Sequence, residues 1–278
     1  MHFFLKAFSL LLRIAPKAII KITYKIIYSL LFHVLKMRRK VVLENLKIAF
    51  PSKPDIWYYE TMKACYKFFT NEFLDFLSYP RFFNNQNIKI ENIEVIKEAF
   101  KQKKGVIFVG AHFGAFDKLF FKLNELKFDL TGVAYKQNSG SADIFFKDIR
   151  ENFLKKQFYK GGDAKLLSKC LKENNGLILL SDQDAKKKGV VVKFFNNESS
   201  THSGAAILSK RKKCPMVYFE IIKVDNYYNV KFKKISKSLG IIDIVQAYTK
   251  EIEKSIKKAP EQYFWFHKRW KTFKKYQW

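Results

Sequence analysis

The sequence predicts an α/β fold, a mixed, mainly parallel sheet flanked by helices, with an N-terminal amphipathic membrane-associating helix in front of it. From about residue 88 onward, short apolar runs alternate with amphipathic helical patterns. This alternation is typical of layered α/β folds. Residues 1–43 differ, because they hold nine Lys or Arg and no acidic residue. We therefore expect a membrane-anchoring segment over residues 1–36 and one domain over residues 37–278.

The elements of the domain are predicted from its apolar runs and turn signals. Two helices come first, at 38–51 and 54–78, and Pro51 ends the first of them. Helices and strands then alternate along most of the remaining chain. The expected strands lie at 105–111, 129–135, 176–181, 190–195, 215–223 and 228–234, and the expected helices at 93–102, 115–126, 141–157, 163–173, 203–212 and 241–258.

The N-terminal segment has one basic face. At about 100° per residue, Lys6, Arg13, Lys17, Lys21 and Lys25 fall within an arc of about 120°. The other face consists of Phe, Leu, Ile and Tyr, a pattern typical of a helix lying in a membrane interface. No apolar run reaches the roughly 18 residues of a spanning helix. A helix packed on the domain and a single tilted spanning segment are the alternatives.

The net charge of +28 predicts an anionic partner. Nucleic acid, an anionic membrane, an acidic carrier protein and a phosphorylated substrate all satisfy this requirement. The sequence has no helix-turn-helix, zinc-finger or RNA-binding signature, and the apolar face of the N-terminal segment favours lipid. We therefore expect no nucleic acid. A non-enzymatic basic protein that binds membrane or nucleic acid is kept as an alternative.

The three cysteines predict neither disulfides nor a metal centre. Cys65, Cys170 and Cys214 are far apart and form no Cys-x-x-Cys or zinc pattern. Such cysteines are typical of reduced, intracellular proteins, in which most serve as small buried apolar residues. We expect no metal site and no bound cofactor.

A histidine and an aspartate mark the end of the first expected strand of this alternating region. Residues 105–117 predict a buried strand that ends in small residues and leads into a helix from about Ala115. His112 falls in the turn and Asp117 in the first helical turn, so the two side chains can face each other across the bend. An imidazole oriented by a carboxylate can take a proton from a hydroxyl. The alternative is a first-turn Asp that complements the helix dipole beside an incidental His.

Two further blocks carry polar side chains. Asp182, Gln183 and Asp184 follow the expected strand at 176–181, and strand ends of this kind line the ligand crevice of α/β sheets. A turn held by Asp side chains is the alternative for this block. The block at 259–271 mixes aromatic and basic residues, which fits a phosphate-contacting strand or a membrane-facing edge.

Four blocks in this order resemble the lipid A late acyltransferases of Gram-negative bacteria, within the lysophospholipid acyltransferase superfamily. They are Arg-Arg-x4-Glu-Asn-Leu-x3-Phe-Pro at 38–51, His-x4-Asp at 112–117, Asp-Gln-Asp at 182–184 and Ala-Pro-Glu-Gln-Tyr-x-Trp-x-His-x-Arg-x-Lys at 259–271. The resemblance implies a membrane-associated enzyme on the cytoplasmic face of the inner membrane. Such an enzyme transfers a fatty acyl group from acyl carrier protein, its co-substrate, to a hydroxyl of a lipid A precursor.

The resemblance also implies roles for single residues. His112 matches the catalytic base and Asp117 its partner carboxylate, although the family more often has Glu there. Lys136 stands where relatives usually carry Arg, and a Lys lacks the bidentate fork of a guanidinium. The backbone N–H groups of Phe113 and Gly114 are candidate donors to the carbonyl oxygen, as is Lys136. The expected substrate-binding residues are Lys136, Arg150, Asp182, Gln183 and Arg269.

The expected partners are therefore an acidic acyl carrier protein, a phosphorylated glycolipid acceptor and an anionic membrane. They agree with the large positive charge. No metal and no enzyme nucleophile are needed, because the acceptor hydroxyl attacks the thioester directly. An acyltransferase that uses a lysophospholipid or another glycolipid as acceptor is the alternative within the superfamily.

Overall fold

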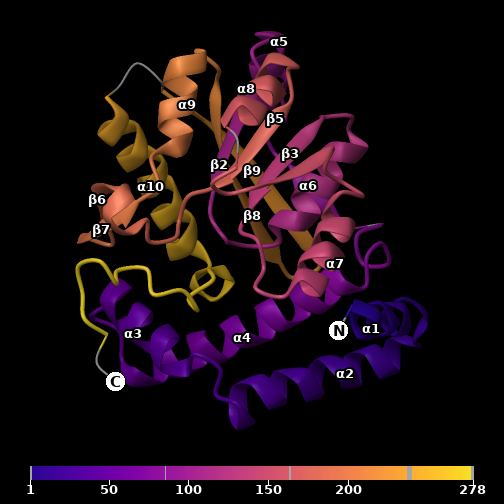
Figure 1. Cartoon of the computed structure of the whole chain (residues 1–278). Coiled ribbons are helices and arrows are strands. Elements are labelled where there is room, and N and C mark those ends of the chain that lie inside the picture. Colours follow the sequence, from indigo (N-terminus) through magenta and orange to yellow (C-terminus); the bar gives the residue numbers. More distant parts are fainter. Residues whose placement is uncertain (1, 85, 163, 237–239, 277–278) are drawn as a thin grey trace.

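The computed structural model describes residues 2–84, 86–162, 164–236 and 240–276, and it confirms the predicted fold class (Figure 1). Within these residues, seven strands form a mixed sheet in the order β1-β9-β8-β2-β5-β3-β4. The five strands from β8 to β4 run parallel, whereas β9 is antiparallel to β8 and parallel to β1. The strands are β1 (Ile88–Ile90), β2 (Val106–Gly110), β3 (Leu130–Ala134), β4 (Lys156–Tyr159), β5 (Gly176–Leu180), β8 (Met216–Val224) and β9 (Tyr227–Ile235), and a separate hairpin joins β6 (Val190–Phe194) to β7 (Asn197–Thr201).

Helices cover both faces of this sheet and extend beyond it. In Figure 1, α4 and the two N-terminal helices lie below the sheet, and α5 lies at the opposite end. The helices are α1 (His2–Ile14), α2 (Lys17–Ser29), η1 (Leu30–Val34), α3 (Arg39–Ala49), α4 (Asp55–Leu77), α5 (Glu94–Lys101), α6 (Phe116–Glu125), α7 (Gly140–Arg150), α8 (Ala164–Lys172), η2 (Lys186–Lys188), α9 (Gly204–Lys212), α10 (Ile241–Lys258) and η3 (Pro260–Gln262).

Alternation along the central strand β2 divides the core into two layers. Ile107 and Val109 pack into one apolar cluster with α10 and the C-terminal tryptophans. Val106 and Phe108 pack into the other cluster with α5 and α6. Successive side chains of a strand point to opposite faces, so a strand that is apolar at every position is buried on both sides. β2 therefore lies at the centre of the domain.

Two of the expected elements differ from the structure. The helix expected at 141–157 ends at Arg150, and the edge strand β4 begins at Lys156. β4 adds to the sheet by pairing with β3, and this long-range pairing overrides the local helical pattern. The strand expected at 190–195 exists, but it pairs with β7 outside the main sheet.

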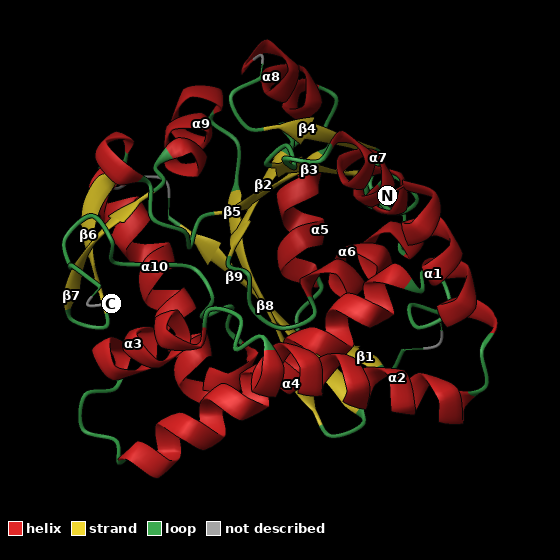
Figure 2. Cartoon of the chain, turned by 60° about the horizontal axis from the view of Figure 1, so that its bottom comes forward, coloured by secondary structure: helices red, strands yellow, loops and turns green. Residues whose placement is uncertain are grey.

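The N-terminal segment is not one helix but is divided into α1 and the stretch formed by α2 and η1. The chain breaks at Pro16, because proline has no N–H and its ring obstructs a continuing helix. Arg81 fixes the break by donating from Nη1 to the carbonyl oxygens of Leu12, Arg13 and Ala15. The helix α1 packs against α7 and α2 packs against α4 (Figure 2).

Many apolar side chains of α1, α2 and η1 face outward. Ten of them are exposed: Phe3, Phe4, Leu10, Leu11, Ile14, Ile19, Ile22, Ile26, Leu30 and Val34. We call this set the N-terminal apolar face. In the part of the chain that the structure describes, no single helix is long and apolar enough to cross a membrane. Only the stretch Lys17–Val34 taken together with Arg39–Ala49 reaches that length and composition, and these two parts are bent by 81°.

Candidate active site

The register of two neighbouring strands brings the central residues of the site together. β2 and β5 are parallel and pair Gly110 with Leu180 at their carboxyl ends. His112 and Asp182 each lie two residues beyond this pair. The Ser181 N–H donates to the Gly110 carbonyl oxygen at 2.9 Å and extends the pairing toward them. Both side chains therefore emerge at the edge of the sheet where ligands bind in open α/β folds.

Asp182 holds the His112 imidazole. Nδ1 of His112 lies 2.8 Å from Oδ1 of Asp182. The Asp182 side chain is 3% exposed and that of His112 is 30% exposed, so a buried carboxylate supports a ring that is open to a cavity. The ring makes no other hydrogen bond to any residue that the structure describes, which leaves Nε2 for a substrate.

This geometry differs from the expectation that Asp117 orients the ring. The carboxylate on Nδ1 comes from the neighbouring strand end and not from the helix that follows His112. Asp182 contacts the ring because His112 and Asp182 each lie two residues beyond Gly110 and Leu180, which are paired in neighbouring strands. Asp182 was expected to bind substrate, but its carboxylate is buried beneath the imidazole.

The charges of the pair stabilise each other. Burial alone would lower the pKa of His112, but the negative charges of Asp182 and Asp117 outweigh burial, and the pKa is raised. Burial alone would raise the pKa of Asp182, yet His112 and nearby backbone N–H groups hold it below its usual value. Asp182 is therefore ionised at neutral pH, and its acceptor oxygen keeps the ring proton on Nδ1.

Asp117 is a second carboxylate near the ring. It occupies the first turn of α6 and lines the same cavity as His112. Burial raises the pKa of Asp117 to about 6, although the charges of Arg150 and His112 act in the opposite direction. No described hydrogen bond joins Asp117 to the imidazole, so the two groups interact through their charges.

The cavity beside His112 has an apolar part and a cationic part. Its volume is about 840 Å³. The apolar lining includes Phe116, Phe120, Val133, Leu154, Leu167, Ile178, Leu179 and Leu208, and the cationic lining comprises Lys147, Arg150, Lys156 and Lys160. His202 also lines the cavity, and burial, followed by the charge of Lys160, lowers its pKa to about 4. The space can hold an aliphatic chain and an anionic group side by side.

The two backbone N–H groups expected to face a carbonyl oxygen are already engaged. The Phe113 N–H donates to the Ala111 carbonyl oxygen, and the Gly114 N–H donates to that of Gln262, both at 2.8 Å. Gly114 has a φ of +62°, and a Cβ there would lie 1.7 Å from the Ile221 carbonyl oxygen. The residue is thus a glycine because the backbone of β8 approaches closely, and neither N–H is free in this structure.

The expected substrate-binding residues divide into two groups. Arg150 and Gln183 line the cavity with His112. The Nη1 of Arg150 donates to Gln157 Oε1 at 3.0 Å, whereas the Gln183 amide makes no hydrogen bond within the described residues. Lys136 is exposed in the loop after β3 and does not line the cavity.

Arg269 does not reach the cavity either. Its side chain is buried and donates to the Ser200 carbonyl oxygen at 2.7 Å, to Ser199 Oγ at 3.2 Å and to Thr201 Oγ1 at 2.5 Å. It also lies over the Phe194 ring. Arg269 was expected to bind substrate, and in this structure three oxygens of β7 occupy its guanidinium.

The C-terminal block packs against the site from behind. The Phe264 N–H donates to the His112 carbonyl oxygen at 3.0 Å. Asp184 accepts from the Thr272 N–H at 3.1 Å and from Thr272 Oγ1 at 2.8 Å. Trp265 and Trp270 are fully buried. The aromatic residues of this block therefore form core rather than a membrane-facing edge.

In this α/β domain, a buried carboxylate holds a histidine beside a cavity that can take an aliphatic chain. Enzymes built in this way activate a hydroxyl group or water for attack on a lipid acyl group. The comparison with protein families narrows this class. The model of the bacterial lipid A biosynthesis acyltransferases matches residues 1–272, and the chain belongs to this family. A comparison with curated proteins found no match. Membership implies an acyltransferase with a lipid A-type acceptor and an acyl donor.

Proposed function

We propose that the chain transfers a fatty acyl group from acyl carrier protein to a hydroxyl of a phosphorylated lipid A precursor, with His112 as the general base. The hydrogen bond between His112 Nδ1 and Asp182 Oδ1 carries this proposal. It lies beside a cavity with apolar and cationic walls, in a member of the lipid A acyltransferase family.

The reaction needs no covalent enzyme intermediate. Asp182 keeps the proton on Nδ1, so Nε2 carries a lone pair. Nε2 takes the proton of the acceptor hydroxyl while the hydroxyl oxygen forms a bond to the thioester carbonyl carbon. The tetrahedral intermediate then breaks its carbon–sulfur bond, and the departing thiolate receives the proton from the imidazolium. General-base catalysis of this kind contributes typically about 10²–10⁴-fold to a rate.

Two other residues support this chemistry. Asp117 adds a second negative charge near the imidazolium that forms during the reaction. The Gln183 amide lines the cavity without a described partner, and we assign it as a donor to the developing oxyanion. It takes the place of the Phe113 and Gly114 N–H groups, which are engaged elsewhere.

The walls of the cavity suggest where each substrate lies. The acyl chain packs on the apolar wall that includes Phe116, Phe120 and Leu179. The cationic wall, with Arg150 and Lys156, faces phosphate of the acceptor or of the carrier's prosthetic group. The +28 net charge attracts both the acidic carrier and the phosphorylated acceptor.

The acceptor is a lipid, and the N-terminal apolar face offers a surface for its membrane. α1 packs against α7, which carries the cavity residues Lys147 and Arg150. α1, which carries part of the N-terminal apolar face, therefore lies beside a helix that lines the catalytic cavity. We propose that this face lies in the cytoplasmic surface of the inner membrane, where lipid acceptors are delivered to the site.

The test is a mass measurement of the product. The full chain, in neutral detergent, is incubated with acyl-acyl carrier protein and a tetra-acylated, phosphorylated lipid A precursor. The expected product is heavier by one acyl group, and His112→Ala should abolish this gain while the variant still folds. A gain only on lysophospholipid would keep the catalytic pair and change the acceptor. No transfer to either acceptor would contradict the proposal.

A further inference from the structure

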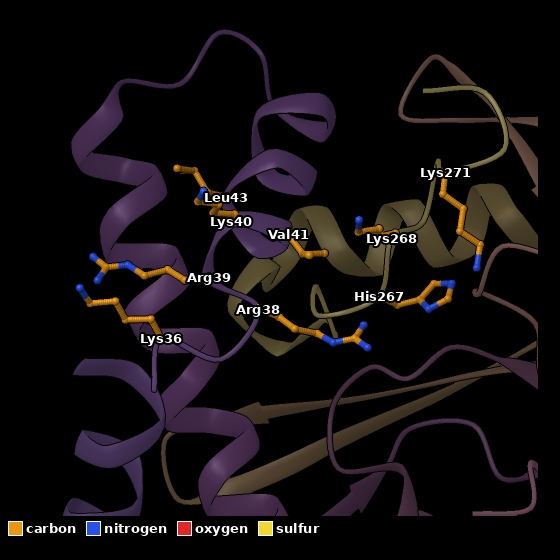
Figure 3. Close-up of a pocket in the computed structure, with 9 residues that line it drawn as sticks. All are labelled: Lys36, Arg38, Arg39, Lys40, Val41, Leu43, His267, Lys268 and Lys271. Atoms are coloured by element: carbon orange, nitrogen blue, oxygen red, sulfur yellow. The ribbon is translucent and has the colours of Figure 1, made fainter. Parts of the chain in front are cut away.

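A second cavity lies between α3 and the C-terminal segment, and cations dominate its walls (Figure 3). Its volume is about 890 Å³, and it shares no lining residue with the cavity of His112. We call it the basic cavity. Six of its nine lining residues are cationic, and none of the described lining residues is acidic. The lining residues are Lys36, Arg38, Arg39, Lys40, Val41, Leu43, His267, Lys268 and Lys271.

The walls of the basic cavity are fixed by hydrogen bonds. Arg38 Nη1 donates to the Phe266 carbonyl oxygen at 2.9 Å. Asn45 Nδ2 donates to the His267 carbonyl oxygen at 2.7 Å, and so ties α3 to the opposite wall. On that wall, His267 Nε2 accepts from the Asp184 N–H at 3.1 Å. These hydrogen bonds hold α3 and the C-terminal segment in place on either side of the cavity, so its walls are formed without a ligand.

The positive charge of the basic cavity favours an anionic ligand. Burial lowers the pKa of His267 to about 4, so the ring is neutral and the positive charge comes from lysine and arginine. The amino-terminal end of α3 adds the positive end of its helix dipole at the same place. Because Nε2 of His267 accepts a hydrogen bond, the ring proton is on Nδ1, where it is a donor.

Exposed apolar residues stand next to the basic cavity in the sequence. Val34 is 67% exposed, Leu35 60% and Met37 43%. They flank the cavity residue Lys36 in the sequence, so the N-terminal apolar face continues directly into the cations. A ligand that suits both surfaces carries an anionic group next to hydrocarbon. A membrane phospholipid has this chemistry.

We propose that the basic cavity binds the phosphate of an anionic phospholipid while the N-terminal apolar face lies in the bilayer. This inference rests on the membrane docking proposed above and not on the acyl-transfer chemistry. The phosphate of the acceptor offers similar chemistry, but the acceptor must reach His112, and the two cavities have separate linings. An acidic protein would also supply an anion, but the exposed apolar residues beside Lys36 continue the surface that we propose lies in the bilayer, and this favours a lipid.

The test compares two triple variants of the full chain that lose the same charge. Lys36→Gln/Lys40→Gln/Lys271→Gln removes three exposed cations of the basic cavity. Lys101→Gln/Lys103→Gln/Lys104→Gln removes three exposed lysines beside α5, at the far end of the molecule from α3 (Figure 1). Both variants leave Arg38 and its structural hydrogen bond intact.

Binding is measured by flotation with two kinds of vesicle, phosphatidylcholine alone and phosphatidylcholine with one-third phosphatidylglycerol. The unaltered chain should bind the anionic vesicles more tightly than the neutral ones. The basic-cavity variant should lose about 10- to 100-fold of affinity for anionic vesicles, since each lysine near a membrane contributes on the order of a few-fold or more. The α5 variant should lose less than about threefold, and all three proteins should bind neutral vesicles equally.

Several results would overturn the inference. Equal losses in the two variants would assign the effect to net charge and not to the cavity. Failure of the unaltered chain to bind either vesicle would remove the membrane docking as well. The KM values of the basic-cavity variant for acyl transfer in neutral detergent distinguish the other ligands. A raised KM for the phosphorylated glycolipid would assign the cavity to the acceptor. A raised KM for acyl carrier protein would assign it to the carrier. An unchanged KM for both supports the phospholipid.

Discussion

At the scale of single residues, the site combines carboxylates in two different environments. Asp182 is ionised because it accepts hydrogen bonds from His112 and from backbone N–H groups, and its pKa is lowered. Asp117 has fewer such partners, and burial raises its pKa to about 6. Ionised Asp117 is therefore costly in the folded state, and a group that destabilises the fold but faces the substrate cavity is typical of functional sites.

Substitution of Asp117 by Asn should stabilise the protein above pH 6. Because the folded-state pKa lies above the ordinary value of 3.8, the folded state is favoured when Asp117 is protonated, and this advantage is lost as the pH rises through about 6. Asn removes the cost, so we expect a gain of about 1–3 kcal/mol in the free energy of unfolding at pH 7.5 and little gain at pH 4. Acyl transfer should fall at the same time.

Denaturant unfolding at the two pH values measures this effect, with Asp148→Asn as the control for an exposed carboxylate. If Asp117→Asn is less stable than the unaltered protein at pH 7.5, favourable contacts stabilise the ionised carboxylate. That result would contradict the conclusion that burial of Asp117 destabilises its ionised form.

The residue scale also shows what could be predicted from the sequence. His112 and the strand that carries it were recognised from the apolar run and the small-residue turn. Its hydrogen-bond partner was expected five residues away and lies 70 residues away. The signal for Asp182 was present, because both residues follow the same kind of strand at the same offset. This equal offset identifies Asp182 as the partner of His112 only when β2 and β5 are known to be neighbours. No local sequence pattern shows which strands are neighbours.

At the scale of elements, α6 is fixed to α4 by a buried cation. Lys118 Nζ donates to Glu72 and to Asp75, each at 2.7 Å, and to the Tyr228 hydroxyl at 2.8 Å. Tyr24 of α2 also donates to Asp75. The cluster thus joins α2, α4 and β9 to the helical turn that carries Asp117.

Replacing Lys118 by Met should destabilise the fold by about 3–5 kcal/mol, because two half-buried carboxylates lose the buried cation that pairs with both. Lys122→Met on the same helix is the matched control. Lys122 pairs with Glu125 at the surface, and loss of such a pair changes stability by about 0–1 kcal/mol. Urea unfolding in detergent gives both values. Equal stability of the two variants would show that the cluster contributes nothing beyond an exposed ion pair.

The elements that could not be predicted have a common cause. The short edge strands β1 and β4 exist through pairing with β9 and β3, which are distant in sequence. β7 was not among the expected strands, because its polar sequence has no apolar period; it pairs with β6, and Arg269 donates to its Ser200 and Thr201 oxygens. The central strands and most helices were predicted correctly, because each carries its own apolar period.

At the scale of the whole molecule, one surface is unusually apolar. The N-terminal apolar face gathers exposed Phe, Leu and Ile side chains over α1, α2 and η1. The basic cavity adjoins it in the sequence at Lys36. The division of the chain at residue 36 and the role of the first segment as an anchor stay predictions of the sequence.

Removing apolar side chains from this face should weaken membrane binding. For Leu10→Ser/Leu11→Ser we expect vesicle affinity to fall by about 10²-fold, since two leucines no longer leave water on binding. Leu126→Ser/Ile242→Ser removes two equally apolar exposed side chains outside the face. Flotation with neutral vesicles compares the variants. A loss no greater than that of the control would contradict membrane docking through α1.

The central claim is that Asp182 orients His112 and raises its pKa during acyl transfer. The pH dependence of the transfer rate, measured for Asp182→Asn and for Asp117→Asn, tests it most directly. The base acts in its neutral form, so the acid limb of the profile follows the pKa of His112. We predict that Asp182→Asn lowers the rate by about 10²–10⁴-fold and moves the acid limb to lower pH by more than Asp117→Asn does. An unchanged rate and acid limb in Asp182→Asn, with both changes in Asp117→Asn, would contradict the claim and return the orienting role to Asp117.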